Sequence, residues 1–142
     1  MNVELRALLD NPCVLRIFMI DHITVFVTDL TKSRAFYEKA FTPFAFSLSF
    51  GQEKKFWAFD VGDGALFEIA QYTGKDKLTH CHIAFRANSQ EQVREFYEVA
   101  LTAGGRCNGK PGPRPQYTKN YYAAFIIDPD GHNIEAVFDK VN

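Results

Sequence analysis

The chain has 142 residues, which fits one domain with a full hydrophobic core, and 46% of them are hydrophobic, which excludes an intrinsically disordered chain. The formal net charge is −1 without a basic cluster, so neither nucleic acid nor a membrane surface is an expected partner. Three cysteines without a C-x-x-C pair argue against a disulfide framework and a thiolate metal site, and they favour a cytoplasmic location.

The first 18 residues are expected to form an N-terminal extension ahead of a single domain at residues 19–142. A short helix from Val3 to Leu9 is predicted within the extension, because its leucines share one face. The first half of the domain is predicted to contain, in chain order, a strand from Met19 to Val27, a helix that begins after the N-cap Asp29 and ends at Pro43, and strands at 45–50, 55–60 and 65–71.

The second half of the domain is predicted to follow the same order of strand, helix and strands. A capping box of Ser89 and Gln92 marks the start of its helix. A turn from Asp128 to Gly131 has proline second and glycine fourth, which is typical of type I. The expected order is a polar linker at 73–78, a strand at 81–87, a helix from Ser89 to Gly104, a loop rich in glycine and proline at 109–115, and strands at 121–127 and 133–138.

The two halves are similar in sequence. When His22 is aligned with His82, a His-Ile pair opens both strands, and a Phe-Tyr pair follows in both helices without a gap. Each half also ends with Asp-Gly, two intervening residues, an apolar residue and a glutamate, which is Glu68 or Glu135. The repeat predicts an α+β fold of two tandem βαβββ modules, at residues 20–72 and 80–139.

Strand alternation places the polar residues of the repeat on the face opposite its apolar residues. His22 and His82 oppose the isoleucines beside them, and Glu68 and Glu135 oppose their apolar neighbours. Two imidazoles and two carboxylates at equivalent positions form a ligand set for one divalent cation, such as Zn, Ni, Co, Mn or Fe. All four side chains are expected to converge on that cation within the domain.

Several other residues have alternative interpretations. His80 shares the face of His82 and is an alternative ligand, although the register of the repeat favours His82. His132 follows the turn and is expected to be exposed to solvent. Arg114 is expected either to hold a substrate carboxylate or phosphate, or to be an ordinary loop residue. The nearby aromatic residues either line a substrate site or pack in the core; Tyr117 and Tyr121 are the candidates for the site, and the core is favoured for Tyr122, Trp57 and Phe59.

These segments resemble the glyoxalase I, bleomycin-resistance and extradiol-dioxygenase group, the vicinal oxygen chelate superfamily. The resemblance covers residues 20–139, and its most specific part is Asp128-Pro129-Asp130-Gly131-His132-Asn133-Ile134-Glu135. It implies a curved mixed sheet, built from the paired modules, around a metal-containing cavity where substrate oxygens chelate the metal. Its other carriers are Ile20-Asp21-His22-Ile23-Thr24-Val25, Ser33-Arg34-Ala35-Phe36-Tyr37 and His82-Ile83-Ala84-Phe85.

The resemblance also implies roles for the four donors. His22, His82 and Glu135 resemble the two-His-one-carboxylate triad of extradiol dioxygenases, and Glu68 resembles the fourth ligand of glyoxalase I. Four protein ligands suit a Lewis acid without redox chemistry, and either Glu68 or Glu135 would transfer a proton between adjacent carbons. No basic cluster is available for the glutathione carboxylates, so lactoylglutathione is not implied as the product.

Three functions follow from these observations. The four ligands favour a divalent-metal-dependent lyase or isomerase of the glyoxalase type that acts on a small, oxygen-chelating carbonyl substrate. A ligand-binding protein of the bleomycin-resistance type would need no catalytic metal, and an extradiol-type dioxygenase would have no use for Glu68 as a ligand. A homodimer is expected, because this superfamily commonly forms one.

Overall fold

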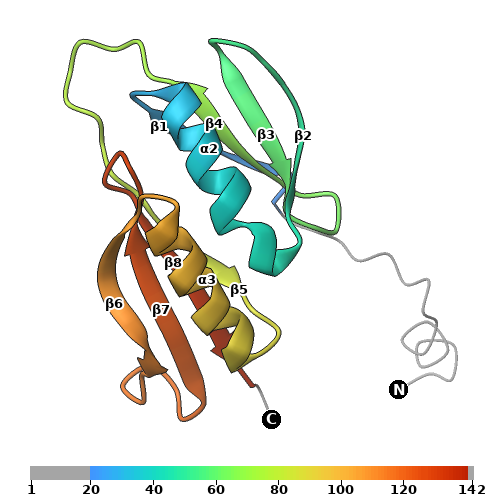
Figure 1. Cartoon of the computed structure of the whole chain (residues 1–142), viewed down its shortest axis with the longest axis vertical. Helices are drawn as coiled ribbons and strands as arrows, with labels where there is room; N and C mark the ends of the chain where they lie inside the picture. Colours follow the sequence, from blue (N-terminus) through green and yellow to red (C-terminus); the bar gives the residue numbers. More distant parts are fainter. Residues whose placement is uncertain (1–19, 141–142) are drawn as a thin grey trace, which may run out of the picture.

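The computed structural model describes residues 20–140, so the predicted N-terminal helix lies outside the described residues. Two βαβββ modules follow one another along the chain, as predicted (Figure 1). The first contains β1 (His22–Val27), α2 (Leu30–Ala40), a 3-10 turn (Thr42–Phe44), β2 (Ser47–Gln52), β3 (Phe56–Asp60) and β4 (Leu66–Gln71). The second contains β5 (His82–Arg86), α3 (Gln90–Thr102), β6 (Arg106–Pro113), β7 (Tyr121–Ile127) and β8 (Asn133–Asp139).

Both helices begin at the predicted N-caps. The Asp29 carboxylate accepts a hydrogen bond from the backbone N–H of Lys32 (2.9 Å), and the Ser89 hydroxyl accepts one from that of Gln92 (3.1 Å). The Gln92 side chain accepts from the N–H of Asn88 (2.6 Å), one residue earlier than a capping box requires. Each cap therefore fixes the residue at which its helix begins.

The two sheets repeat each other in strand order and in register. The order is β1-β4-β3-β2 in one sheet and β5-β8-β7-β6 in the other, and the first pair in each is parallel. Thr24 lies opposite Glu68 in the first pair, and Ala84 lies opposite Glu135 in the second. In each case the histidine that opens the strand stands two residues earlier, so the predicted repeat is confirmed pair by pair.

The prediction of a loop at 109–115 is wrong, because most of that segment belongs to β6. β6 is an edge strand of the second sheet and pairs with β7 only, through a register that shifts twice. Pro111 and Pro113 lack the N–H that a central strand would donate, but an edge strand with bulges has positions where that donor is not needed. Glycine and proline thus mark an irregular edge strand here rather than a loop.

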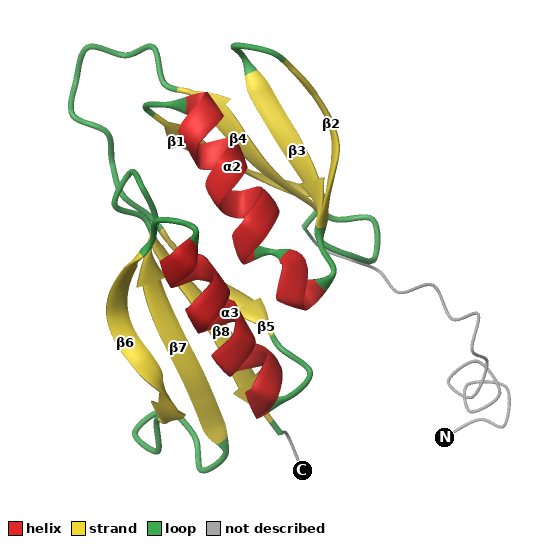
Figure 2. Ribbon diagram, in the orientation of Figure 1, coloured by secondary structure: helices red, strands yellow, loops and turns green. Residues whose placement is uncertain are grey.

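One aromatic core joins the two modules. The ring centroid of Phe85, on β5, lies 5.1 Å from that of Phe41 and 5.6 Å from that of Phe67, which both belong to the first module. The helices α2 and α3 lie against each other on one side of the molecule, with the strands of both sheets behind them (Figure 2). No helix within residues 20–140 has the length and apolar character needed to cross a membrane.

The turn that precedes β8 also joins the modules. Asp128 is 2% exposed, and its carboxylate accepts hydrogen bonds from the Tyr37 hydroxyl of α2 (2.7 Å) and from the backbone N–H of His132 (2.8 Å). Nε2 of His132 lies 2.9 Å from the carbonyl oxygen of Phe26 on β1. His132 is 1% exposed, so the prediction that it faces solvent is wrong: contacts with the other module bury it.

Candidate functional site

The second module brings His82 and Glu135 together on the sheet face that is turned away from α3. His82 opens β5, and Glu135 lies two residues further along the neighbouring β8. Nε2 of His82 is 3.0 Å from Oε2 of Glu135. Glu135 is only 3% exposed, whereas half of the His82 side chain reaches solvent, so the pair forms the floor of an open site.

A set of neighbours on β6, β7 and β8 orients the His82 ring. Phe125 on β7 is stacked against it, with centroids 6.3 Å apart. Nδ1 of His82 lies 3.2 Å from the carbonyl oxygen and 2.7 Å from the side-chain amide nitrogen of Asn133, and Asn108 donates to the Asn133 side chain (3.1 Å). Because Asn108 donates to the amide oxygen of Asn133, the amide nitrogen of Asn133 donates to Nδ1 of His82. The ring then carries its proton on Nε2 and donates it to Oε2 of Glu135, and a cation bound at Nε2 would replace that proton.

Two tyrosines complete the site of the second module. The Tyr121 hydroxyl donates to Oε1 of Glu135 at 2.7 Å, and burial together with this hydrogen bond raises the pKa of Tyr121 to about 12. The ring of Tyr117, which is 60% exposed, lies 5.1 Å from that of Tyr121. His82, Asn133, Glu135 and the aromatic rings surround a hollow of about 520 Å³. A small organic molecule fits a hollow of this size.

The first module places His22 and Glu68 at the same register, on an open sheet face. Nδ1 of His22 donates to the Asp21 carboxylate (2.8 Å), and this bond, with the nearby charge of Glu68, raises the pKa of His22. The Thr24 hydroxyl donates to Oε2 of Glu68 (2.8 Å). Because Asp21 takes up Nδ1, the Nε2 atom of His22 remains available to a ligand.

The four predicted donors form two pairs rather than one cluster. Within residues 20–140, no group of three or more His, Cys, Asp or Glu side chains is placed to hold a metal ion. The expectation that His22, Glu68, His82 and Glu135 converge within one chain is therefore not met. Phe85 of the second module packs against Phe41 and Phe67 of the first, and this packing holds one sheet relative to the other.

The donor atoms of the second pair nevertheless suit a divalent cation. Two ligands bound at right angles, each about 2.1 Å from a metal, are about 3.0 Å apart. The observed separation of His82 Nε2 and Glu135 Oε2 is 3.0 Å. His82 and Glu135 each also have an orienting partner behind the donor atom: the side-chain amide of Asn133 at Nδ1 of His82, and the Tyr121 hydroxyl at Oε1 of Glu135.

Arg114 and His80, two further residues that the sequence singled out, make contacts of other kinds. The Arg114 guanidinium donates to the backbone carbonyls of Lys110 (2.8 Å) and Pro113 (3.0 Å), so it braces the end of β6 in the way expected of an ordinary structural residue. The His80 ring lies against Gly131 and edge-on to the His132 ring, with centroids 5.8 Å apart. The sequence analysis missed Asp21, Thr24 and Asn133, although each lies beside a predicted donor or shares its strand face.

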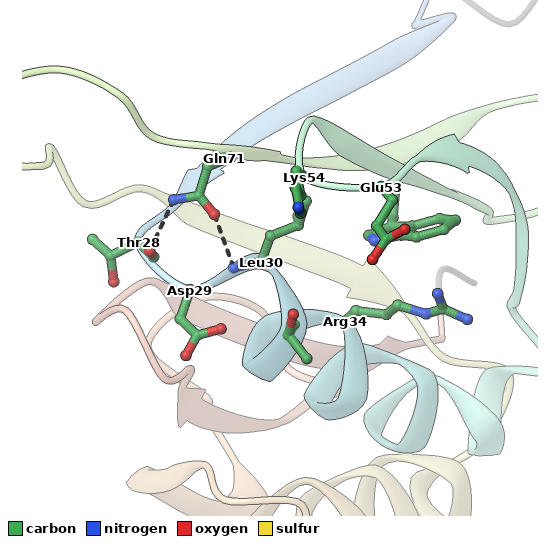
Figure 3. Close-up of a pocket in the computed structure, with 9 residues that line it drawn as sticks. Thr28, Asp29, Leu30, Arg34, Glu53, Lys54 and Gln71 are labelled. Carbon is green, nitrogen blue, oxygen red and sulfur yellow. Dashed lines mark hydrogen bonds between the residues drawn. The ribbon is translucent and has the colours of Figure 1, made fainter.

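A second hollow lies in the first module, on the side of α2, and sequence reasoning missed it. It has a volume of about 590 Å³ between the start of α2 and the β2–β3 hairpin (Figure 3). The Arg34 guanidinium carbon lies 4.1 Å from the ring centroid of Trp57, and Leu30 donates its backbone N–H to Gln71 (3.2 Å). Glu53 and Lys54, of opposite charge, both line it, so the hollow presents no single charge to a ligand.

The chain is similar to a known protein family and to several solved structures. The family model "Glyoxalase/Bleomycin resistance protein/Dioxygenase superfamily" matches residues 19–136. A search of curated proteins gives no match. Among solved structures, a glyoxalase/bleomycin resistance protein from Albidiferax ferrireducens T118 is 26% identical, with a TM-score of 0.74; the match covers 87% of this chain and 100% of that one.

Two more distant structures share the fold. A glyoxalase-related enzyme from Fulvimarina pelagi is 20% identical, with a TM-score of 0.68, and the match covers 84% of this chain and 86% of that one. A lactoylglutathione lyase from Agrobacterium tumefaciens is 16% identical, with a TM-score of 0.65, and the match covers 84% of this chain and 92% of that one. At these identities the likeness concerns the fold.

Proposed function

This chain belongs to the glyoxalase/bleomycin resistance protein/dioxygenase superfamily, and on that premise we propose that it is a divalent-metal-dependent lyase or isomerase of the glyoxalase type. Its substrate is a small carbonyl compound that chelates the cation through two oxygens. The observation that carries this proposal is the pair His82 and Glu135, because Nε2 of His82 and Oε2 of Glu135 are spaced as two ligands of one cation. The other nitrogen of His82 and the other oxygen of Glu135 are held by hydrogen bonds with Asn133 and Tyr121.

A second copy of the chain completes the site in this proposal. Each module offers one imidazole and one carboxylate, on the sheet face turned away from its helix, and the two faces do not meet within one chain. The face around Glu68 also carries Phe26 and Phe50, both 50% exposed, which makes it an apolar surface suited to a partner. In a homodimer, the first pair of one protomer meets the second pair of the other.

The chemistry that this donor set supports is proton transfer between neighbouring carbons. A bound divalent cation supplies Lewis acidity, which makes the C–H bond beside a chelated carbonyl more acidic. One glutamate takes that proton and returns it to the adjacent carbon, so the substrate is isomerised without an oxidant or reductant. Tyr117, Tyr121 and Phe125 form an aromatic wall that places the substrate beside the carboxylate.

Mixing two defective variants tests the shared site directly. His22→Ala and His82→Ala each remove one imidazole, and neither is expected to bind Co²⁺ with the affinity of the unchanged protein. After the two variants are mixed and allowed to exchange subunits, half of the dimers are heterodimers, and each has one intact site. Calorimetric titration should then recover roughly a quarter of the original sites. No recovery, in a mixture shown by mass spectrometry to contain heterodimers, contradicts the shared site.

Activity measurements separate the competing functions. With Co²⁺ bound, turnover of 2-oxo or 2-hydroxycarbonyl compounds should proceed without oxygen. Oxygen consumption coupled to cleavage of a catechol ring would instead identify a dioxygenase. Tight binding of an organic ligand that is unaffected by chelators, without turnover, would identify a ligand-binding protein of the bleomycin-resistance type.

A further inference from the structure

The hollow between α2 and the β2–β3 hairpin is far larger than its counterpart in the second module. Gln71 turns its side chain onto the β1–α2 loop, where it accepts from the N–H of Leu30 (3.2 Å) and donates to the carbonyl of Thr28 (2.8 Å), as Figure 3 shows. Phe138, the equivalent residue of the second module, packs against the core instead. The hollow that Phe138 lines has a volume of about 220 Å³, against about 590 Å³ here, so the fold itself does not require the larger space.

A flat stack of two side chains forms one wall of this hollow. Gly51 leaves room for the indole ring of Trp57 against β2, since a methyl group there would clash with that ring. The guanidinium carbon of Arg34 lies 4.1 Å from the ring centroid, and two of its nitrogens donate to Oε1 of Glu38 (3.3 and 3.4 Å). The Arg34 side chain is 36% exposed and lines the hollow. The outer face of its guanidinium therefore offers a surface on which an aromatic ring can stack.

The tip of the hairpin adds two charges of opposite sign. Glu53 and Lys54 are adjacent, exposed, and part of the lining. The N–H of Lys55 closes their turn by donating to the carbonyl of Gln52 (2.9 Å), and Lys54 has a φ of +64°. Neither charged side chain forms a hydrogen bond or an ion pair with any residue between 20 and 140. Both charges are therefore available to a ligand.

The start of α2 does not make the hollow an anion site. The backbone N–H of Leu30 donates to Gln71 and that of Lys32 to Asp29 (2.9 Å), so both donors are taken. The carboxylate of Asp29 is also part of the lining and repels a lone anion, while Lys54 repels a lone cation. A ligand that carries both charges suits this lining better than either ion alone.

We propose that the hollow binds a free aromatic α-amino acid as its zwitterion. The ring stacks on Arg34, the ammonium group lies beside Glu53, and the carboxylate lies beside Lys54. A hollow of about 590 Å³ is large enough for such a molecule. The hollow is on the α2 side of the first sheet, whereas His22 and Glu68 are on the other face, so this binding does not depend on a metal ion.

The single tryptophan of the chain lies in the hollow, so its fluorescence reports occupancy directly. L-phenylalanine is the probe, because its own emission does not overlap that of tryptophan. Its titration should change the emission of Trp57 in a saturable way. Two analogues keep the ring and lose one charge: phenylalanine amide lacks the carboxylate, and N-acetylphenylalanine lacks the ammonium. Each should bind about two- to fivefold more weakly than L-phenylalanine.

Variants of the hairpin test which charge meets which residue. Glu53→Gln should weaken L-phenylalanine binding by about two- to fivefold without weakening that of N-acetylphenylalanine, which has no ammonium. Lys54→Gln should weaken L-phenylalanine binding to a similar extent without weakening that of phenylalanine amide. Lys55→Gln is the matched control, since Lys55 is adjacent but not part of the lining, and it should leave all three affinities unchanged.

Two further variants test the space and the stack. Gln71→Phe introduces the ring that the second module has at this position, and it should abolish the fluorescence response in protein whose circular dichroism is unchanged. If that variant does not fold, Arg34→Gln gives an independent test. It removes the stacking surface and should weaken all three probes by a similar factor, because the ring is common to them.

Three results would overturn the proposal. The first is the absence of a saturable response to L-phenylalanine in the unchanged protein. The second is equal affinity for the three probes, which would show that the charges of the hairpin do not select the ligand. The third is a full response in folded Gln71→Phe, which would mean that the ligand binds elsewhere. Each result leaves the metal-dependent function untouched.

Discussion

The two modules share a backbone plan but support their polar pairs in opposite ways. In the second module, the residue across from the glutamate is Phe125, and the glutamate is buried under aromatic rings; in the first module it is Ala58, and the glutamate is half-buried. Thr24 donates to Glu68, whereas Ala84 at the same register has nothing to donate. Register thus fixes where the donors stand, and the side chains opposite them decide how firmly each is held.

The turns before the last strands differ in the same direction. Asp60 accepts from the backbone N–H of Gly62 (2.8 Å) in an exposed turn of the first module. Asp128 accepts three hydrogen bonds in a buried turn of the second, from Tyr37, Asp130 and His132. The turn of the second module therefore contacts the first module through Tyr37, whereas the hydrogen bond of Asp60 stays within its own turn.

Removal of a shared core ring should have the largest effect. Phe41 is fully buried and contacts rings of both modules, so Phe41→Ala should lower the free energy of unfolding by about 3–5 kcal/mol. Phe50→Ala is the matched control, since that ring is 50% exposed within one chain; at protein concentrations where the chain is monomeric, it should have an effect of about 1 kcal/mol or less. Urea unfolding should remain a single transition in both variants; two separate transitions would show that the modules unfold independently.

Asp128→Ala is expected to have the next largest effect. It leaves a buried hydroxyl, a buried N–H and a half-buried N–H without their acceptor, which should destabilise the fold by about 2–4 kcal/mol. Asp60→Ala removes one exposed acceptor and should cost about 1 kcal/mol or less. Equal losses in thermal unfolding would mean that the buried turn does not hold the modules together.

The buried tyrosine gives the contact between modules a dependence on pH. Burial, and then the charge of Asp128, raises the pKa of Tyr37 well above 10 in the folded chain. The unfolded chain therefore loses the Tyr37 proton first, so stability is full below pH 10 and falls as the pH rises above it. The stability advantage over Tyr37→Phe should shrink by about 1.4 kcal/mol for each pH unit above 10. Urea midpoints at pH 9 and 11 measure this; an unchanged difference contradicts the burial of the hydroxyl.

The smallest expected effects come from two arginines at equivalent helix positions. Arg34 stacks on Trp57 at 4.1 Å, and Arg94 lies 5.7 Å from the ring centroid of Tyr122. Arg34→Gln should cost about 0.5–1 kcal/mol and change the fluorescence of the single tryptophan. Arg94→Gln should have a similar or smaller effect on stability and leave the fluorescence unchanged. A fluorescence change with Arg94→Gln would mean that the fluorescence of Trp57 responds to changes in both modules.

Local sequence signals predicted most of the fold. The caps Asp29 and Ser89 and the ungapped repeat placed both helices and the order of the strands, because these features depend on neighbouring residues. The edge strand β6 was not predicted, since proline tolerance depends on whether a strand has one neighbour or two. The burial of His132 was not predicted either, because it depends on contact with Phe26, 106 residues away.

The candidate site was predictable in its residues but not in its assembly. Repeat symmetry identified His22 and His82 as equivalents, and Glu68 and Glu135 likewise. It carried no information on how the two modules are oriented, which rings such as Phe85 determine by packing across the junction. Equivalent positions in two modules can face one cavity or two, and only three-dimensional packing distinguishes these cases.

The contact between Tyr37 and Asp128 has a consequence for synthesis on the ribosome. The two residues are 91 positions apart, and those that join His132 to Phe26 are 106 positions apart. At ordinary rates of translation, Tyr37 of the first module emerges about 5–18 s before Asp128, which accepts the hydrogen bond from its buried hydroxyl. During that interval its aromatic core lacks Phe85 and the turn at 128–132, and it presents an apolar surface to chaperones. The late C-terminal segment therefore completes the folding of the module that was made first.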